Sequence, residues 1–269
     1  MTLPAYAMNA ARFPLMSERD LVGPLFRPWV DELFAHVRLA QGDSLLDVAC
    51  GTGIVARLAR GRLGPSAHVV GVDVSAGMIA VAGELAPHID WREGNAMSLP
   101  VPGDEKFTVV ACQQGLQFVP DKLAAVREMR RVLAAGGRVV VATWLGLEHN
   151  PLFRDLHTVA ERRFGPIHDE RFGYGDGEAL RALLAAGGLR DAEVTALRRV
   201  IRVRDAAAFL HLNCMAEIGM SKVGAQLSDD GRAHLVSVLE RESAAALAPY
   251  RDDGGLAFET AANVATARA

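Results

Sequence analysis

The residues with the clearest chemical potential lie between Leu45 and Ala59, in the stretch LLDVACGTGIVARLA. Gly51 and Gly53 stand between an apolar run and a helix-forming run, and glycines at such a turn let the backbone approach a ligand closely. Asp73 follows Gly53 by 20 residues (73 − 53), at the end of the next apolar run. A carboxylate there accepts hydrogen bonds from both hydroxyls of a ribose. The pattern fits a dinucleotide and other adenosine cofactors equally well.

Asp47 narrows the choice of cofactor. It lies four residues before Gly51 and, facing the turn, would repel a phosphate but suit a ligand with a positive amino group. Asn95 and Ala96 follow the next β-type run, in WREGNAMSLP, where an amide side chain and backbone N–H groups can read the edge of an adenine. Together these positions favour an adenosine that carries an amino acid.

The elements that must position these residues alternate between β-type and helical runs, which predicts a parallel sheet with helices on both faces. We expect strands at 44–49, 68–73, 89–93, 107–113 and 138–144. The helices expected between them cover 54–60, 76–86 and 122–134, the last ending on the glycines at 136 and 137. The carboxyl ends of such strands are where open α/β sheets bind ligands.

The flanking segments are predominantly helical. Residues 1–40 are predicted to be a helical N-terminal extension or lid, with Ser17 as a possible N-cap and with interruptions at Pro24 and Pro28. Residues 41–269 are predicted to be one domain with helical insertions at about 150–187 and 206–248. Asp176 is the expected N-cap of a helix in the first insertion, and two further β-type runs cover 191–203 and 256–262.

Composition excludes several classes of protein. Half of the 269 residues are hydrophobic, so the chain can bury a large core, and its net charge of −3 comes with no basic stripe for nucleic acid. The three cysteines, Cys50, Cys112 and Cys214, are widely spaced and predict reduced thiols in a cytoplasmic protein. We expect no metal site, since no His-x-x-x-His or carboxylate cluster is evident, and no run approaches the roughly 18 apolar residues of a membrane span.

The order of motifs resembles that of one known family. After the glycine turn and WREGNAMSLP come KFTVVACQQGLQFVPD and AAVREMRRVLAAGGRVVVATW. The chain thereby resembles the class I S-adenosylmethionine-dependent methyltransferases, of the small-molecule type related to the ubiquinone and menaquinone biosynthesis enzymes. The resemblance is strong over about 40–145. It implies a Rossmann-like, doubly wound seven-stranded sheet, mostly parallel, whose antiparallel last strand is LAFETAANVATARA.

The resemblance also implies roles for individual residues in binding S-adenosylmethionine. Asp47, the backbone of Ala49 and Gly51 would hold the methionine end, in the turn that also contains Gly53. Asp73 would bind the ribose, and the adenine would contact Val74, Met78, Asn95 and Ala96. Gln113 and Gln114 would lie near the sulfonium. The family often has glycine where this chain has Ala49. We expect that replacement to be conservative only if the φ of Ala49 is negative.

The implied activity is methyl transfer to a small, hydrophobic or aromatic acceptor, leaving S-adenosylhomocysteine. His149 is the candidate general base, because it follows the fifth expected strand, and Tyr6, Phe13 and Phe26 with residues 150–225 could close over the acceptor. A homodimer is also possible. Two alternatives stay open: an NAD-dependent oxidoreductase, although none of the three lysines lies in a Tyr-x-x-x-Lys pair, and a non-methylating protein that binds the same cofactor.

Overall fold

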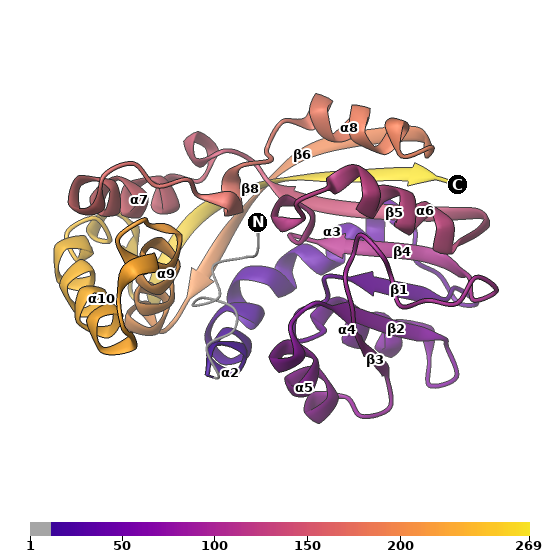
Figure 1. The fold of residues 1–269 in the computed structure, drawn as a ribbon, viewed down its shortest axis with the longest axis horizontal. Helices are drawn as coiled ribbons and strands as arrows, with labels where there is room; N and C mark the ends of the chain where they lie inside the picture. Colours follow the sequence, from indigo (N-terminus) through magenta and orange to yellow (C-terminus); the bar gives the residue numbers. More distant parts are fainter. Residues whose placement is uncertain (1–11) are drawn as a thin grey trace.

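The computed structural model describes residues 12–269, and Tyr6 lies outside them. Within this range the strands form one eight-stranded sheet in the order β3-β2-β1-β4-β5-β8-β6, with β7 paired to β8 (Figure 1). The strands are β1 (Leu45–Val48), β2 (Val69–Asp73), β3 (Asp90–Glu93), β4 (Phe107–Gln113), β5 (Leu133–Trp144), β6 (Arg190–Val203), β7 (Arg251–Asp252) and β8 (Gly255–Arg268). The expected doubly wound sheet is confirmed, and the short β7 adds an eighth strand to the predicted seven.

The parallel part of the sheet consists of β3, β2, β1, β4 and β5, and β8 runs antiparallel to both β5 and β6. One predicted boundary is wrong. The helix expected to reach Ala134 ends at Val132, because Leu133 already pairs with Phe107 and so begins β5. The glycines at 136 and 137 therefore lie within the strand, at an irregularity in its register, and do not end a helix.

Helices cover both faces of the sheet. They are α2 (Phe13–Ser17), η1 (Glu18–Phe26), α3 (Arg27–Val37), α4 (Ile54–Leu63), α5 (Ala76–Leu85), η2 (Leu116–Phe118), α6 (Lys122–Val132), η3 (Leu147–His149), α7 (Pro151–Phe164), η4 (Glu170–Phe172), α8 (Gly177–Ala186), α9 (Ala206–Met220), η5 (Gly224–Gln226), α10 (Asp229–Ser243) and η6 (Ala248–Tyr250). Apolar residues of α3 and α4 pack on one face, and those of α6 and α8 pack on the other. The α8 helix has the predicted N-cap, since Asp176 accepts hydrogen bonds from the N–H groups of Glu178 and Ala179.

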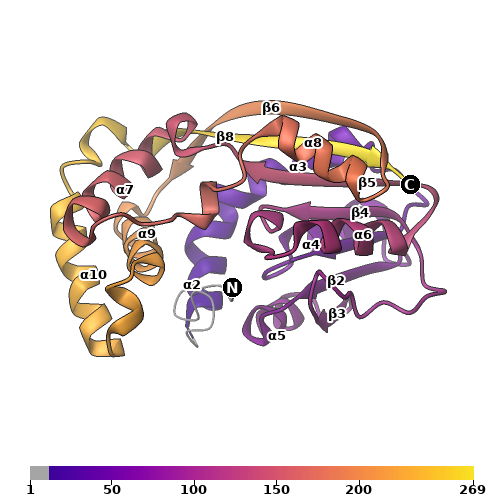
Figure 2. The same ribbon diagram turned by 45° about the horizontal axis from the view of Figure 1, so that its top comes forward.

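A third apolar core lies beyond the sheet, in the unit that we call the cap: α7, η4, α9 and α10. The ends of β6 and β8 extend into it, and Ile201, Leu256 and Phe258 are buried there among cap residues such as Phe153 and Phe209 (Figures 1 and 2). The helices predicted in both insertions are therefore present. The division of the chain at residue 40 stays a prediction.

The N-terminal helices α2 and η1 lie between the sheet and the cap in both views (Figures 1 and 2). Ser17 is the last residue of α2 and makes no capping hydrogen bond, so the predicted N-cap is wrong: the chain is already helical at Phe13. Pro24 lies inside η1, which has π-type geometry. Proline has no N–H for the ladder of an α-helix, which accounts for the change in geometry. No helix in the described range is long and apolar enough to span a membrane.

Candidate functional site

The turn between β1 and α4 is built from left-handed backbone. The φ angles are +56° at Ala49, +55° at Gly51 and +86° at Gly53. A side chain at Gly53 would in addition collide with the ring of Trp91, so glycine is required there for two reasons. The positive φ means that the condition for a conservative replacement at Ala49 is not met, and this alanine holds a conformation that favours glycine.

Asp73 ties this turn to the next strand. Its Oδ2 accepts a hydrogen bond from the N–H of Gly51 at 2.8 Å, and its Oδ1 accepts one from the N–H of Ser75 at 2.9 Å. Burial raises the pKa of Asp73, while the backbone hydrogen bonds act in the opposite direction. The two oxygens of a carboxylate have about four lone-pair sites, so Asp73 keeps capacity to accept a hydrogen bond from a ligand hydroxyl.

Asp47 is a second buried carboxyl group beside the turn. It is 1% exposed, and its Oδ2 accepts a hydrogen bond from the N–H of Ala56 at 3.0 Å. Burial raises the pKa of Asp47 to about 8, and the negative charge of Asp73 adds to the increase. A ligand ammonium would offset this cost of ionisation, because an opposite charge at short range favours the charged form.

These carboxyl groups border a cavity of about 600 Å³, within the usual range for small-molecule sites. The sheet side of its lining contains every predicted cofactor residue except Gly53: Asp47, Ala49, Gly51, Asp73, Val74, Met78, Asn95, Ala96, Gln113 and Gln114. Their proposed roles in binding stay predictions. The opposite side comes from η1 and the cap and is mostly apolar, with Leu25, Phe26, Phe153, Phe172, Leu212 and Met220 among its residues.

The residues expected at the adenine differ in their surroundings. Val74 is 58% exposed and Met78 only 5%, so they offer an accessible and a buried apolar surface respectively. The Oδ1 of Asn95 accepts a hydrogen bond from the N–H of Met97 at 2.9 Å. This bond fixes the amide and leaves its NH₂ group and one oxygen lone pair for a ligand.

Gln113 and Gln114 bring polar atoms to the same cavity. Gln113 donates through Nε2 to the carbonyl of Phe26 at 2.8 Å, whereas its Oε1 is buried without a partner among the described residues. Gln114 is 5% exposed, has a φ of +45°, and neither of its amide atoms has a partner in that range. Unpaired buried amide atoms are costly, and their position in the lining indicates that a ligand completes their hydrogen bonding.

His149 is not in the lining of this cavity. It ends η3, its side chain is 40% exposed, and its Nδ1 lies 3.4 Å from Nη2 of Arg198. No other histidine of residues 12–269 lines the cavity either. The geometry therefore gives no support to His149 as a general base.

Three polar side chains at or near the cavity were not predicted from the sequence. Glu18 of η1 accepts a hydrogen bond from Thr52 in the glycine turn and pairs with Arg57 of α4 at 2.8 Å. Arg171 and Asn213 belong to the cap lining. The spacing of Asn213 and Glu217 on an otherwise apolar helix, HLNCMAEIGM, was an available signal, because residues four apart share one helix face.

Comparison with known proteins finds methyltransferases among the sequence relatives of this chain. Residues 46–141 match the family model of a methyltransferase domain. Demethylmenaquinone methyltransferase of Halalkalibacterium halodurans is 34% identical over 155 residues, covering 54% of this chain and 61% of the relative. The ubiquinone/menaquinone biosynthesis C-methyltransferase UbiE of Xanthomonas campestris pv. campestris is 38% identical over 166 residues, covering 60% of each. The matches thus span about three fifths of the length of these curated relatives.

A solved structure extends the likeness to the whole fold. Phosphoethanolamine N-methyltransferase 2 of Haemonchus contortus, in complex with phosphomonomethylethanolamine and S-adenosylhomocysteine, superposes with a TM-score of 0.60. The superposition covers 99% of this chain and 59% of that one, at 18% identity. At this identity the likeness concerns the fold alone.

Proposed function

We propose that this chain, in which residues 46–141 are a methyltransferase domain of the class I S-adenosylmethionine-dependent family, transfers a methyl group to a small apolar or aromatic acceptor. One observation carries the proposal. A single cavity joins the glycine turn and two buried carboxyl groups on the sheet side to an apolar lining on the cap side. The first part has the chemistry to bind the cofactor, and the second has the chemistry to bind the acceptor.

The residues on the sheet side fit S-adenosylmethionine. Asp47 would pair with the amino group of the methionine end, and the free lone pairs of Asp73 would accept the ribose hydroxyls. The unpaired amide atoms of Gln114 offer hydrogen bonds farther along the cavity. Bound there, S-adenosylmethionine supplies a methyl group already activated by its sulfonium.

The contribution of the protein is then to align the acceptor and exclude water. Leu25 and Phe26 of η1 line the same cavity as the turn, so a bound acceptor would contact these apolar groups. Since none of the described histidines lines the cavity, we propose acceptors whose nucleophilic atom ionises readily or needs no base. Residues 12–40 serve as the predicted lid in this proposal.

An NAD-dependent oxidoreductase is not favoured, because the relatives found are methyltransferases. A protein that binds S-adenosylmethionine without transferring its methyl group would have the same sheet edge, and only an activity measurement separates it. We also propose that the protein acts in the cytoplasm without a nucleic-acid partner; the net charge of −3 supports the second point. The homodimer stays a prediction.

Calorimetric titration tests the cofactor. S-adenosylmethionine and S-adenosylhomocysteine are expected to bind and to raise Tm, by about 2.7 kcal/mol of added stability at 100 times Kd, and NAD is expected to do neither. Asp73→Ala should abolish this binding. Asp121→Asn, at the exposed N-cap of α6, is the matched control and should bind normally. Stabilisation by NAD alone would overturn the proposal.

Transfer of a radiolabelled methyl group to a panel of small phenols, quinols and amines tests the reaction itself. Labelled product is expected with the wild-type protein and the Asp121→Asn control, and none with Asp73→Ala. Methylation confined to protein or RNA would contradict a small-molecule acceptor.

A further inference from the structure

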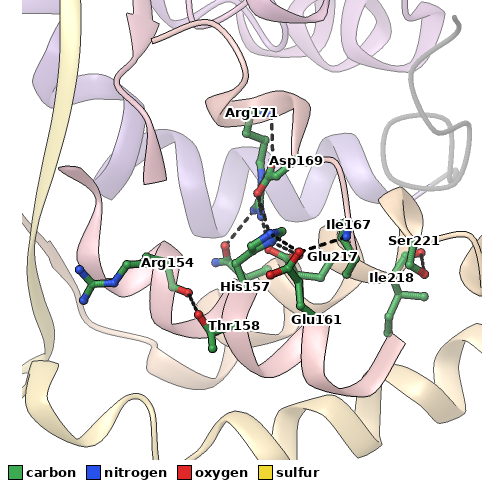
Figure 3. A network of polar contacts seen from close by, with 11 residues as sticks. Arg154, His157, Thr158, Glu161, Ile167, Asp169, Arg171, Glu217, Ile218 and Ser221 are labelled. Atoms are coloured by element: carbon green, nitrogen blue, oxygen red, sulfur yellow. Dashed lines mark hydrogen bonds and ion pairs between the residues drawn. The ribbon is translucent and has the colours of Figure 1, made fainter. Parts of the chain in front are cut away.

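The cap contains a buried charged cluster that the cofactor site does not use. Arg171 is its centre, and around it lie His157 of α7, Asp169 at the start of η4 and Glu217 of α9 (Figure 3). Asn213 of α9 accepts a hydrogen bond from Arg171 as well. The three elements are thereby fixed to one another. Arg171 and Asn213 also line the cavity, whereas the carboxylates stand behind them.

The guanidinium is held in a defined orientation with one N–H left over. Nε and Nη2 donate to Asp169, Nη2 donates to Glu217 as well, and Nη1 donates to Oδ1 of Asn213 at 3.1 Å. A guanidinium has five N–H groups, and these bonds within the described range use four of them. The remaining N–H is on Nη1, the nitrogen that also contacts the cavity residue Asn213.

The cluster does not resemble a metal site. His157, Asp169 and Glu217 have possible ligand atoms within 4.8 Å of one another, but the guanidinium of Arg171 already binds both carboxylates. A cation would have to displace it. The carboxylates are better described as positioning residues for Arg171.

The charge of the cluster limits what the free N–H can bind. Two carboxylates face one guanidinium and one histidine, so the cluster is neutral with His157 protonated and carries one negative charge otherwise. It is positive in neither state, and Glu161 lies only 3.6 Å from the His157 ring. A carboxylate or phosphate would therefore gain little from Arg171, whereas a neutral oxygen would gain a hydrogen bond to a charged donor.

Aromatic side chains surround the same donor. The guanidinium carbon lies 5.8 Å from the ring centroid of Phe153 and 5.6 Å from that of Phe172, and both rings line the cavity. An apolar ring bound beside these side chains would place an oxygen substituent within reach of Nη1.

We propose that Arg171 and Asn213 form the acceptor subsite for a neutral oxygen, a carbonyl or hydroxyl, on a flat apolar molecule. This inference rests on the proposed function and adds the class of acceptor. The oxygen bound by Arg171 lies at the cap side of the cavity, opposite the turn that would hold the cofactor.

Three matched probes test the subsite: 2-naphthol, 2-methylnaphthalene and 2-naphthoate, titrated by calorimetry with and without saturating S-adenosylhomocysteine. The wild-type protein is expected to bind 2-naphthol about tenfold more tightly than either of the others, as fits a hydrogen bond from a charged donor. Equal affinity for 2-naphthol and 2-methylnaphthalene, tighter binding of 2-naphthoate, or no binding of any probe would overturn the inference.

Arg171→Lys tests the residue itself, since it keeps the charge beside the carboxylates but loses the planar fork. The preference for 2-naphthol should fall to about twofold or less in this variant, with the Kd for S-adenosylhomocysteine unchanged. Arg163→Lys, whose partner is the surface residue Glu242, is the control and should keep the full preference. A full preference in Arg171→Lys contradicts the assignment.

If Arg171→Lys does not fold, the order of the three probe affinities in the wild-type protein still tests the proposed subsite. Failure of S-adenosylhomocysteine to bind the wild-type protein would count against the proposed function. The probe ranking without cofactor would still test the subsite, so the two failures are distinguishable.

Discussion

At the scale of single residues, the glycine turn lies beside two buried aspartates and contains one strained alanine. Ala49 has a φ of +56°, a conformation in which a Cβ meets the following carbonyl oxygen. Its backbone also lies in the cavity lining, beside Gly51. The turn therefore retains this conformation because the surrounding structure requires it, and the strain is open to measurement.

Ala49→Gly is expected to stabilise the protein. The left-handed conformation costs an alanine about 1 to 2 kcal/mol, and the extra freedom of glycine in the unfolded chain cancels about 0.5 to 1 kcal/mol of the relief. A net gain of about 0.5 to 1 kcal/mol raises Tm by about 1 to 3 °C in a thermal denaturation experiment. Ala134→Gly, in β5 with a negative φ, is the control and should lower Tm. A lower Tm for Ala49→Gly would contradict the inference that the backbone of Ala49 is strained.

The raised pKa of Asp47 leads us to expect that the protein releases a proton when the cofactor binds. Its pKa of about 8 keeps it protonated at pH 6.5 in the free protein, and the ammonium of the ligand favours the ionised form. Binding of S-adenosylhomocysteine at that pH should release close to one proton, and affinity should increase from pH 6 to pH 8. Calorimetry in two buffers of different ionisation enthalpy measures the number released. Asp47→Asn should release none and lose the pH dependence; equal release by both proteins argues against the ammonium pairing.

At the scale of elements, η1 is connected to the glycine turn through the side chain of Glu18. Glu18 accepts a hydrogen bond from Thr52 and pairs with Arg57, and this ion pair links η1 to α4. Glu18→Gln is expected to increase the dissociation rate of S-adenosylhomocysteine severalfold with little change in the association rate, as a loosened lid would. Stopped-flow fluorescence measures both rates. The exposed Glu84→Gln on α5 should leave both unchanged, and an unaltered dissociation rate in Glu18→Gln excludes a lid role for this link.

The connection between α7 and α9 predicts a pH-dependent stability. The hydrogen bond to Glu217 raises the pKa of His157 above its usual value, so the protonated form is favoured in the folded state. The resulting stability is fully present below the unfolded pKa of about 6.5 and is lost as pH rises through the higher folded pKa. In urea denaturation, His157→Gln should therefore cost more free energy of unfolding at pH 5.5 than at pH 9. Exposed His88→Gln is the control; a cost for His157→Gln that does not vary with pH contradicts the ionic role.

The strands of the sheet were largely predictable from sequence, because continuous apolar runs such as VVGVD and FTVVACQ are typical of parallel strands that are buried on both faces. The start of β5 was not, since the glycines at 136 and 137 are typical of a helix end, while the pairing of Leu133 with Phe107 is a tertiary contact. The same distinction applies to the site. The turn residues are close in sequence, but Arg171 and Asn213 reach the cavity only through the packing of the cap.

At the scale of the whole molecule, the cavity lies where two separately packed parts meet. The sheet cores contain α3, α4, α6 and α8, while the core of the cap contains α7, α9 and α10. The cavity lining takes residues from the sheet edge, from η1 and from the cap. A ligand that contacts all three parts should make their local unfolding interdependent. Opening of any one part would then require the release of the ligand.

Hydrogen exchange followed by mass spectrometry measures this coupling. Saturating S-adenosylhomocysteine is expected to slow amide exchange by tenfold or more in the turn at 49–56 and in η1 at 21–26. The size of the effect depends on the ratio of the ligand concentration to Kd. Helix α8 is the internal control, because none of its residues lines the cavity. Slowing confined to 49–56 would show that η1 does not close on the cofactor, and equal slowing in α8 would indicate global stabilisation without a specific joint between the sheet and the cap.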